Sequence, residues 1–207
     1  MLNELHLEVL KEVINIGVGK GAEVLNTMVQ SHISLEVPEV KIFGSDEYSR
    51  FQEHFSETDY SIITLPFNGE LNGFSKLIMS SEHAAKLVDA FIGKHGASIE
   101  MDSLRVDILS EIGNIITNAV MGTLSNMLSL ELGYIVPSYE MGRKDIIIPK
   151  EIIANASAIL YAQTHFKIEE FETKGNFAIF FTLKSFEALV TKIQLFLGEN
   201  FSSESLK

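Results

Sequence analysis

The sequence predicts an α/β fold of the α+β type, with two pseudo-symmetric halves around a mainly antiparallel sheet. Each half is expected to contain a long helix, strands and a second helix. Two observations predict this fold. Apolar residues at helical spacing alternate along the chain with short β-branched runs, and the same order of elements occurs twice. We therefore expect one domain, residues 1–207, built of two repeats at about 1–97 and 98–207.

The first half begins with a helix predicted over residues 4–29, where Leu7, Leu10, Ile14 and Val18 recur at helical spacing. The other elements of this half follow in order: an extended segment at 33–43 that contains Pro38, a polar loop at 45–59, two strands at 60–67 and 71–79 joined by a turn at Asn68 and Gly69, and a helix at 81–92. The expected cap of that last helix is Ser80 or Ser81, and its expected stop is Gly93.

The second half repeats this order after a boundary expected within residues 93–101. Its long helix is predicted at 102–130, where Leu109, Ile112 and Ile116 lie on one face. The other elements follow in order: an extended segment at 134–141 that contains Pro137, an irregular connection at 143–154, strands at 155–166 and 176–183, and a helix at 184–197 that stops at Gly198. The polar tail after this glycine is expected to fray.

The composition excludes several classes of function. The chain has 16 basic and 28 acidic residues and a net charge of −12, which disfavours nucleic acid and anionic membrane surfaces as partners. It has no cysteine, so disulfides, thiolate catalysis and cysteine-bound zinc are excluded. No signal peptide is evident, and no apolar run approaches the roughly 20 residues needed to cross a bilayer. We expect a cytoplasmic protein without membrane insertion.

One spacing of three residue types occurs twice in the chain. A glutamate is followed by an asparagine three residues later and by a proline after 23 more, and the whole set recurs 99 residues on. The two sets are Glu12, Asn15 and Pro38, and Glu111, Asn114 and Pro137. From average residue usage, one such set arises by chance about once in 10⁴ starting positions. Two sets in one short chain therefore indicate a shared role.

Helix geometry places each set on one face, because residues three and four apart stack on a helix surface. The resulting polar stripes are Glu8, Glu12 and Asn15 in the first helix, and Asp107, Ser110, Glu111, Asn114 and Asn118 in the second. The simplest alternative is a solvated face, which every amphipathic helix has. Each proline could likewise mark only an edge strand. The shared register of the two stripes favours a functional site.

These residues resemble the signature of the CheC/CheX/FliY phosphatase family: aspartate or serine, three residues, glutamate, two residues, asparagine, 22 residues, proline. The second set matches at every position, through Asp107, Glu111, Asn114 and Pro137. The first set departs twice, with Glu8 in place of aspartate or serine and with Ile14 in place of the usual glycine. Two sites in one chain resemble the CheC type, whereas CheX carries one site.

The resemblance implies an enzyme, a phosphatase that hydrolyses the aspartyl-phosphate of a CheY-type response regulator and so ends chemotaxis or related two-component signalling. An acyl phosphate already has a good leaving group, so hydrolysis mainly needs an in-line water and charge stabilisation. A carboxamide can donate and accept hydrogen bonds to such a water, which makes Asn15 and Asn114 the catalytic candidates. The resemblance further implies that Glu12 and Glu111 pair with a regulator lysine, although either could also assist the water as a base.

The remaining groups are expected to support the site or to come from the partner. The regulator's own Mg²⁺ and lysine would stabilise the phosphoryl charge, so this chain needs no cofactor. The six histidines show no ligand spacing, so we expect no metal site. Asp107 and Glu8 either orient the glutamate or the partner, or are merely solvated, and Pro38 and Pro137 shape the nearby backbone. The resemblance also implies a CheD-type deamidase as a candidate regulator.

Two other functions are compatible with the sequence. A non-catalytic module could bind a phosphorylated response regulator or a flagellar-switch component, although the presence of both asparagines favours catalysis. Residues 17–22 (GVGKGA) match a loose dinucleotide-binding pattern, and Glu36 lies at a suitable distance beyond them. That pattern requires a strand before the glycines. A single helix over residues 4–29 would therefore remove this third alternative.

Overall fold

The computed structural model describes residues 3–29, 33–92, 101–148, 157–168 and 171–204. Its elements in chain order are α1 (Glu4–Val29), β1 (Ile33–Phe43), the 3₁₀ turn η1 (Ser45–Glu47), α2 (Tyr48–Gln52), β2 (Tyr60–Gly69), β3 (Gly73–Ser80), α3 (Ser81–Ile92), α4 (Met101–Met127), β4 (Leu132–Tyr134), β5 (Ser138–Gly142), η2 (Lys144–Ile146), β6 (Ser157–Ile168), β7 (Phe171–Thr182) and α6 (Leu183–Glu204). The predicted fold class, helices around a mainly antiparallel sheet, is confirmed.

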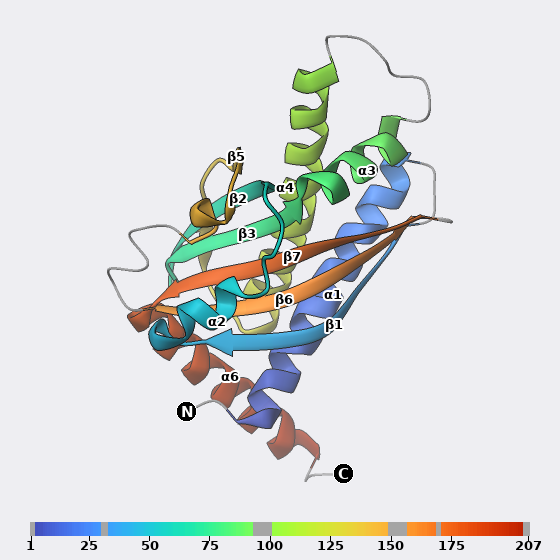
Figure 1. Cartoon of the computed structure of the whole chain (residues 1–207). Coiled ribbons are helices and arrows are strands. Elements are labelled where there is room, and N and C mark those ends of the chain that lie inside the picture. The colour runs from blue at the N-terminus through green and yellow to red at the C-terminus, as the bar shows by residue number, and fades with distance from the viewer. Residues whose placement is uncertain (1–2, 30–32, 93–100, 149–156, 169–170, 205–207) are drawn as a thin grey trace.

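The described strands form one seven-stranded antiparallel sheet in the order β1-β6-β7-β3-β2-β4, and β5 also pairs with β2. The long helices α1 and α4 cross behind this sheet, and the short helix α2 lies in front of it (Figure 1). From one edge to the centre the strands are β1, β6 and β7, and from the other edge to the centre they are β4 with β5, then β2 and β3. Each strand of the first set lies about 99 residues from its counterpart in the second set, so the two halves of the sheet have the same order. A duplicated chain would give this order. The repeat boundary itself stays a prediction, because residues 93–100 lie outside the described residues.

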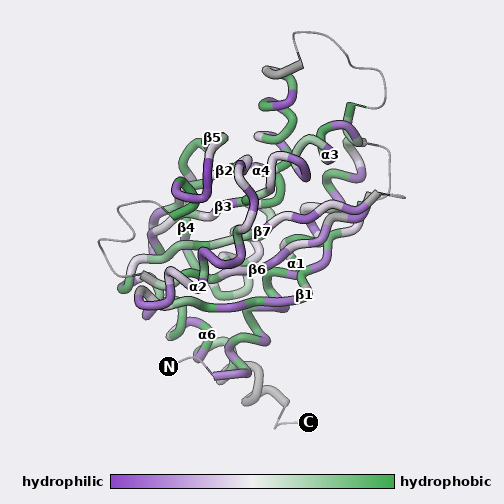
Figure 2. The backbone as a smooth tube through the Cα atoms, in the orientation of Figure 1, coloured by the Kyte–Doolittle hydropathy of each residue, from purple (hydrophilic) through white to green (hydrophobic). Residues whose placement is uncertain are grey.

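The sheet separates two apolar cores. Successive strand residues point to opposite faces, so in β6 Leu160 and Ala162 join the core beneath α1, α3, α4 and α6, whereas Ile159 and Tyr161 join the smaller core beneath α2. The second core is largely aromatic and contains Phe51 of α2. The strands β6 and β7 are hydrophobic toward one end and more hydrophilic toward the hairpin that joins them, whereas the helices alternate between hydrophobic and hydrophilic residues (Figure 2). This pattern is typical of helices with one face on a sheet.

The helices α1 and α4 make backbone-to-backbone contact at two glycines of α1. A Cβ atom on Gly17 would lie 2.6 Å from the Cα of Val120, and one on Gly21 would lie 3.4 Å from the Cα of Ile116. A Cβ on Gly19, between them, would meet nothing within 4 Å. The glycines at 17 and 21 therefore serve helix packing. Because they lie within the single helix Glu4–Val29, no strand precedes them, and the dinucleotide-binding alternative is removed.

Several predictions for the first half are confirmed. The helix over residues 4–29, the extended segment at 33–43 and the helix at 81–92 match α1, β1 and α3. Ser80 caps α3, because its Oγ accepts a hydrogen bond from the His83 backbone N–H at 3.2 Å. The predicted stop at Gly93 lies outside the described residues.

Two predictions for the first half are wrong. The polar loop at 45–59 contains η1 and α2, because Phe51 and Phe55, scattered among acidic residues, are both buried in the smaller core. The turn at Asn68 and Gly69 is also misplaced. The strand β2 continues through Gly69, which has a φ of 118°, and the connection to β3 follows at residues 70–72.

The second half departs further from prediction. The strand expected at 176–183 begins at Phe171, because polar residues of β6 and β7, such as Lys167 and Glu172, pair in an extended hairpin. The segment expected at 134–141 is divided into β4 and β5 around Pro137. The last helix does not stop at Gly198 or fray directly after it, since α6 continues to Glu204. Residues 149–156 of the predicted irregular connection and strand lie outside the described residues.

Candidate functional site

The polar stripes of both motif helices reach solvent. The four carboxylates Glu8, Glu12, Asp107 and Glu111 are exposed, while Asn15 and Asn114 are half-buried. In the described part of the chain, none of these carboxylates forms an ion pair. Their negative charges are therefore available to a cationic group of a partner.

In the first site, the edge strand β1 holds the side chain of Asn15. The backbone N–H of Val37 donates a hydrogen bond to Asn15 Oδ1 at 3.2 Å. The pairing of β1 with β6 shifts register between Glu36 and Glu39, so Val37 has no partner residue in β6. Its N–H is thus free to bind the motif helix. The carboxamide oxygen of Asn15 is engaged, and its nitrogen makes no hydrogen bond to any described residue.

In the second site, Asn114 is held from within its own helix. The Nδ2 of Asn118 donates to Asn114 Oδ1 at 2.6 Å. The strand donor of the first site has no equivalent contact here: Val136 lies 99 residues after Val37 and is 83% exposed, whereas Val37 is 3% exposed. The same atom of the motif asparagine is therefore engaged in both sites, but by different donors.

Both motif prolines lie at breaks in edge strands. In β1 the break lies between Glu36 and Glu39. On the other edge, β2 pairs first with β5 and then with β4, and the register shifts by one residue between them. Pro38 and Pro137 lie within these two breaks. A proline can occupy such a position because no ladder hydrogen bond is lost. This placement fits a role in shaping the backbone.

The departure of the first motif at Ile14 has a packing reason. A Cβ on Gly113, the equivalent position of the second motif, would lie 2.5 Å from Ile63 of β2. The strand residue equivalent to Ile63 at the first site is Ala162. Ile63 pairs with Tyr139, and Ala162 pairs with Val40, which lies 99 residues before Tyr139. Ile14 and Ala162 are both fully buried in the same core. The second site thus combines a small helix residue with a large strand residue at these equivalent positions, and the first site combines a large helix residue with a small strand residue.

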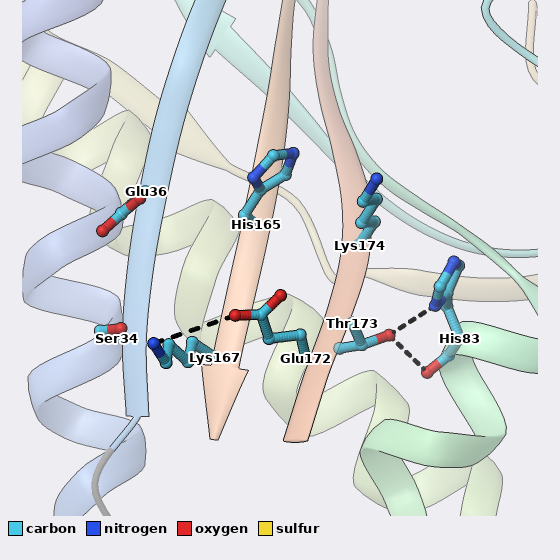
Figure 3. Close-up of a pocket in the computed structure, with 8 residues that line it drawn as sticks. All are labelled: Ser34, Glu36, His83, His165, Lys167, Glu172, Thr173 and Lys174. Carbon is cyan, nitrogen blue, oxygen red and sulfur yellow. Dashed lines mark hydrogen bonds and ion pairs between the residues drawn. The ribbon is translucent and has the colours of Figure 1, made fainter. Parts of the chain in front are cut away.

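A polar cavity of about 450 Å³ lies at the ends of β1, β6 and β7, and no motif residue lines it. Figure 3 shows its lining residues, with Thr173 facing His83 of α3. Lys167 and Glu172 form a long ion pair of 3.9 Å beside it. Among the described residues, no group of three or more histidine, cysteine, aspartate or glutamate side chains could hold a metal ion.

One histidine of this cavity has a determined hydrogen-bonding role. The hydroxyl of buried Thr173 donates to the backbone carbonyl of His83 at 3.2 Å. Its oxygen also lies 2.9 Å from His83 Nδ1, which is the donor in this pair when the hydroxyl hydrogen is held by the carbonyl. Burial lowers the pKa of His83 below its usual 6.5, and the nearby charge of Lys86 lowers it further.

The lowered pKa predicts that His83 makes stability depend on pH. The unfolded chain binds a proton at a higher pH than the folded chain, so the contribution is complete above pH 6.5 and is lost as the pH falls below that value. In His83→Asn, an amide N–H can replace Nδ1–H without titrating. We expect urea unfolding from about pH 8 to about pH 5 to show a smaller loss of stability in this variant than in the wild type. Equal losses would contradict the assignment.

The chain is related to proteins of bacterial chemotaxis. No family model matches it. It is 27% identical over 157 residues to the CheY-P phosphatase CheC of Bacillus subtilis strain 168, an alignment that covers 73% of this chain and 74% of that protein. It also shares the fold of Thermotoga maritima FliY, with a TM-score of 0.73 and 16% identity over 94% of this chain and 98% of the other. These comparisons support the predicted resemblance to the CheC/CheX/FliY family.

Two further structures extend this fold comparison. The CheX–CheY–BeF₃–Mg²⁺ complex of Borrelia burgdorferi gives a TM-score of 0.52 at 15% identity, over 83% of this chain and 99% of the other. The FliG–FliM complex of Helicobacter pylori gives a TM-score of 0.65 at 10% identity, over 92% of this chain and 100% of the other. The fold of the CheC/CheX/FliY family therefore also occurs in FliM. In the described part of this chain, no helix is long and apolar enough to cross a membrane.

The structure places the motif residues as the sequence predicted and adds one group that the sequence analysis missed. Each motif asparagine lies near the helix surface one turn from its glutamate, as predicted. The Val37 backbone donor was missed, because a main-chain N–H leaves no signal in residue types. In the sequence, Pro38 was the available indication that strand pairing is interrupted beside Val37.

Proposed function

We propose that this chain is an aspartyl-phosphate phosphatase that acts on a CheY-type response regulator. One observation carries the proposal: in each motif the carboxamide oxygen is engaged by the protein, and the carboxamide nitrogen is left without a partner in the described residues. Each asparagine therefore presents N–H donors one turn from an exposed, unpaired glutamate. This arrangement suits a site that recognises oxygen atoms of a docked phosphoryl group and its attacking water.

The proposed reaction needs little from the chain beyond positioning. A water oxygen attacks phosphorus in line with the bond to the aspartyl oxygen, that bond breaks, and the aspartate leaves as a carboxylate. Inorganic phosphate and the released proton pass to solvent. Asn15 or Asn114 would orient the water by donating an N–H to it. The regulator's own Mg²⁺ would neutralise the phosphoryl oxygens, so we propose no cofactor on this chain.

The glutamates are proposed to dock the partner. Glu12 and Glu111 are exposed and lack an intramolecular cation in the described residues, so each can pair with a regulator lysine. Loss of Glu should weaken productive binding, whereas loss of Asn should mainly reduce turnover. Asp107 and Glu8 lie one turn earlier and are proposed to orient the glutamate or the partner.

The alternative is a binding module that docks a phosphorylated regulator or a flagellar-switch component without hydrolysis. The FliM fold similarity keeps this alternative open, because fold alone does not decide activity. The 27% identity to a CheY-P phosphatase and the two oriented asparagines support hydrolysis instead.

Turnover separates these two functions. Candidate regulators would be phosphorylated with a small phosphodonor, the excess donor removed, and acyl phosphate decay followed with substoichiometric amounts of the chain. We expect many regulator molecules to be dephosphorylated per chain, because a catalyst is released after each cycle. A stoichiometric binder would leave the decay unchanged or slow it, and that result would favour the binding module.

We further propose that the protein works in the cytoplasm, where phosphorylated regulators occur, and that a CheD-type deamidase is a second partner. Co-purification of a tagged chain with and without the regulator would test this partner. If the tagged chain recovers no CheD-type protein from a strain that produces one, the proposal of this partner is wrong.

A further inference from the structure

We propose that Asn118 is a positioning residue that orients the catalytic carboxamide of Asn114, and that it replaces the backbone donor used in the first site. This inference rests on the proposed phosphatase function. Asn118 follows Asn114 by one helical turn, and its Nδ2 lies 2.6 Å from Asn114 Oδ1. Side chains four residues apart on a helix are neighbours, so this bond is set by the helix itself.

The comparison of the two sites shows why the second one needs such a donor. In the first site, the buried Val37 supplies an N–H to Asn15. In the second, the corresponding strand segment is open, and Val136 is 83% exposed. The position of Asn118 is occupied in the first half by Gly19, which has no side chain to donate. Among the described residues, the oxygen of each motif asparagine therefore accepts from one donor, and the two donors come from different parts of the fold.

The orientation matters because a carboxamide has two unlike ends. Its terminal torsion has two broad minima, which exchange the oxygen and the nitrogen. Phosphoryl oxygens are acceptors, so only the nitrogen end can interact favourably with them. With Oδ1 engaged by Asn118, the N–H end of Asn114 is left for the partner. Asn118 should therefore affect turnover and leave the docking of the regulator through Glu111 unchanged.

The decisive comparison uses two substitutions in an Asn15→Ala background, so that only the second site works. Asn118→Ala removes the donor and allows both orientations; we expect kcat to fall about threefold. Asn118→Asp keeps the shape but supplies an acceptor, which favours the orientation with the oxygen of Asn114 facing outward. We expect kcat to fall by about tenfold or more, with KM and the affinity for the BeF₃-bound regulator unchanged.

A matched control adds an asparagine to the first site. A side chain at Gly19 has free space, and Asn15 is already engaged by Val37, so Gly19→Asn in an Asn114→Ala background should change kcat by less than about twofold. If Asn118→Asp retains the parental kcat, or if it changes only KM or thermal stability, the positioning role is wrong. If Asn15→Ala with Asn114→Ala retains the wild-type rate, the assignment of the site is wrong. If the wild-type chain does not accelerate acyl phosphate decay on the regulator, the proposed phosphatase function itself is wrong.

Discussion

Replacing both Asn15 and Asn114 with alanine is expected to lower the turnover number by about 10² to 10³-fold. Each substitution removes the N–H donors that we propose to orient the attacking water, and neither site could then compensate for the other. Removal of one preorganised donor from a reaction site costs about 3–4 kcal/mol of transition-state stabilisation. Acyl phosphate decay on the regulator, followed with wild type and double variant at equal concentration, measures this effect directly.

The single variants and binding measurements give the controls. If both sites work equally, Asn15→Ala and Asn114→Ala should each lower the rate about twofold. A loss confined to Asn114→Ala would show that the first motif is inactive. The double variant should still bind the BeF₃-bound regulator, because Glu12 and Glu111 remain. A wild-type rate in the double variant would refute the assignment of the site.

The second large effect concerns the contact of the two motif helices. Gly17→Ala should lower the free energy of unfolding by about 1–3 kcal/mol, because its Cβ would lie 2.6 Å from the Cα of Val120. A backbone atom cannot move aside by changing rotamer, so α1 and α4 must separate along their contact. Equilibrium urea unfolding monitored by circular dichroism would measure the change.

Gly19→Ala is the matched control for this prediction. It makes the same substitution two residues further along the same helix, at a position where a Cβ meets nothing within 4 Å. Alanine favours a helix interior more than glycine, so this variant should be more stable than the wild type by about 0.5–1 kcal/mol. Changes of the same sign in both variants would mean that helix propensity, and not the contact with α4, dominates at Gly17.

Helical periodicity was the most informative part of the sequence for predicting the fold. The apolar spacing of Leu10, Ile14 and Val18 predicted the full extent of α1. Short elements were missed where tertiary contacts override local composition: α2 forms in an acidic stretch because Phe51 is buried against the sheet. The start of β7 was missed for a similar reason, since the mostly polar segment 171–175 is extended because β6 pairs with it.

The candidate site was predictable in its residue types but not in its hydrogen bonds. Spacing identified Asn15 and Asn114, because a residue pattern repeated at a fixed distance is visible in one sequence. The donor to Asn15 is a main-chain group of Val37, and its availability depends on a break in strand pairing. The departure of the first motif at Ile14 also has a packing explanation, because the equivalent strand position is the small Ala162 and both residues are buried in the same core.

The contact of α1 with α4 also limits how the two halves could be exchanged. Gly17 and Gly21 face Val120 and Ile116, and a shift of 99 residues converts each of these pairs into the other. In these two pairs the glycines are on α1 and the branched residues are on α4. Two copies of the first half would face each other with glycines and leave a gap, whereas two copies of the second would collide. The contact between α1 and α4 therefore requires one helix with glycines and one with branched residues at these positions.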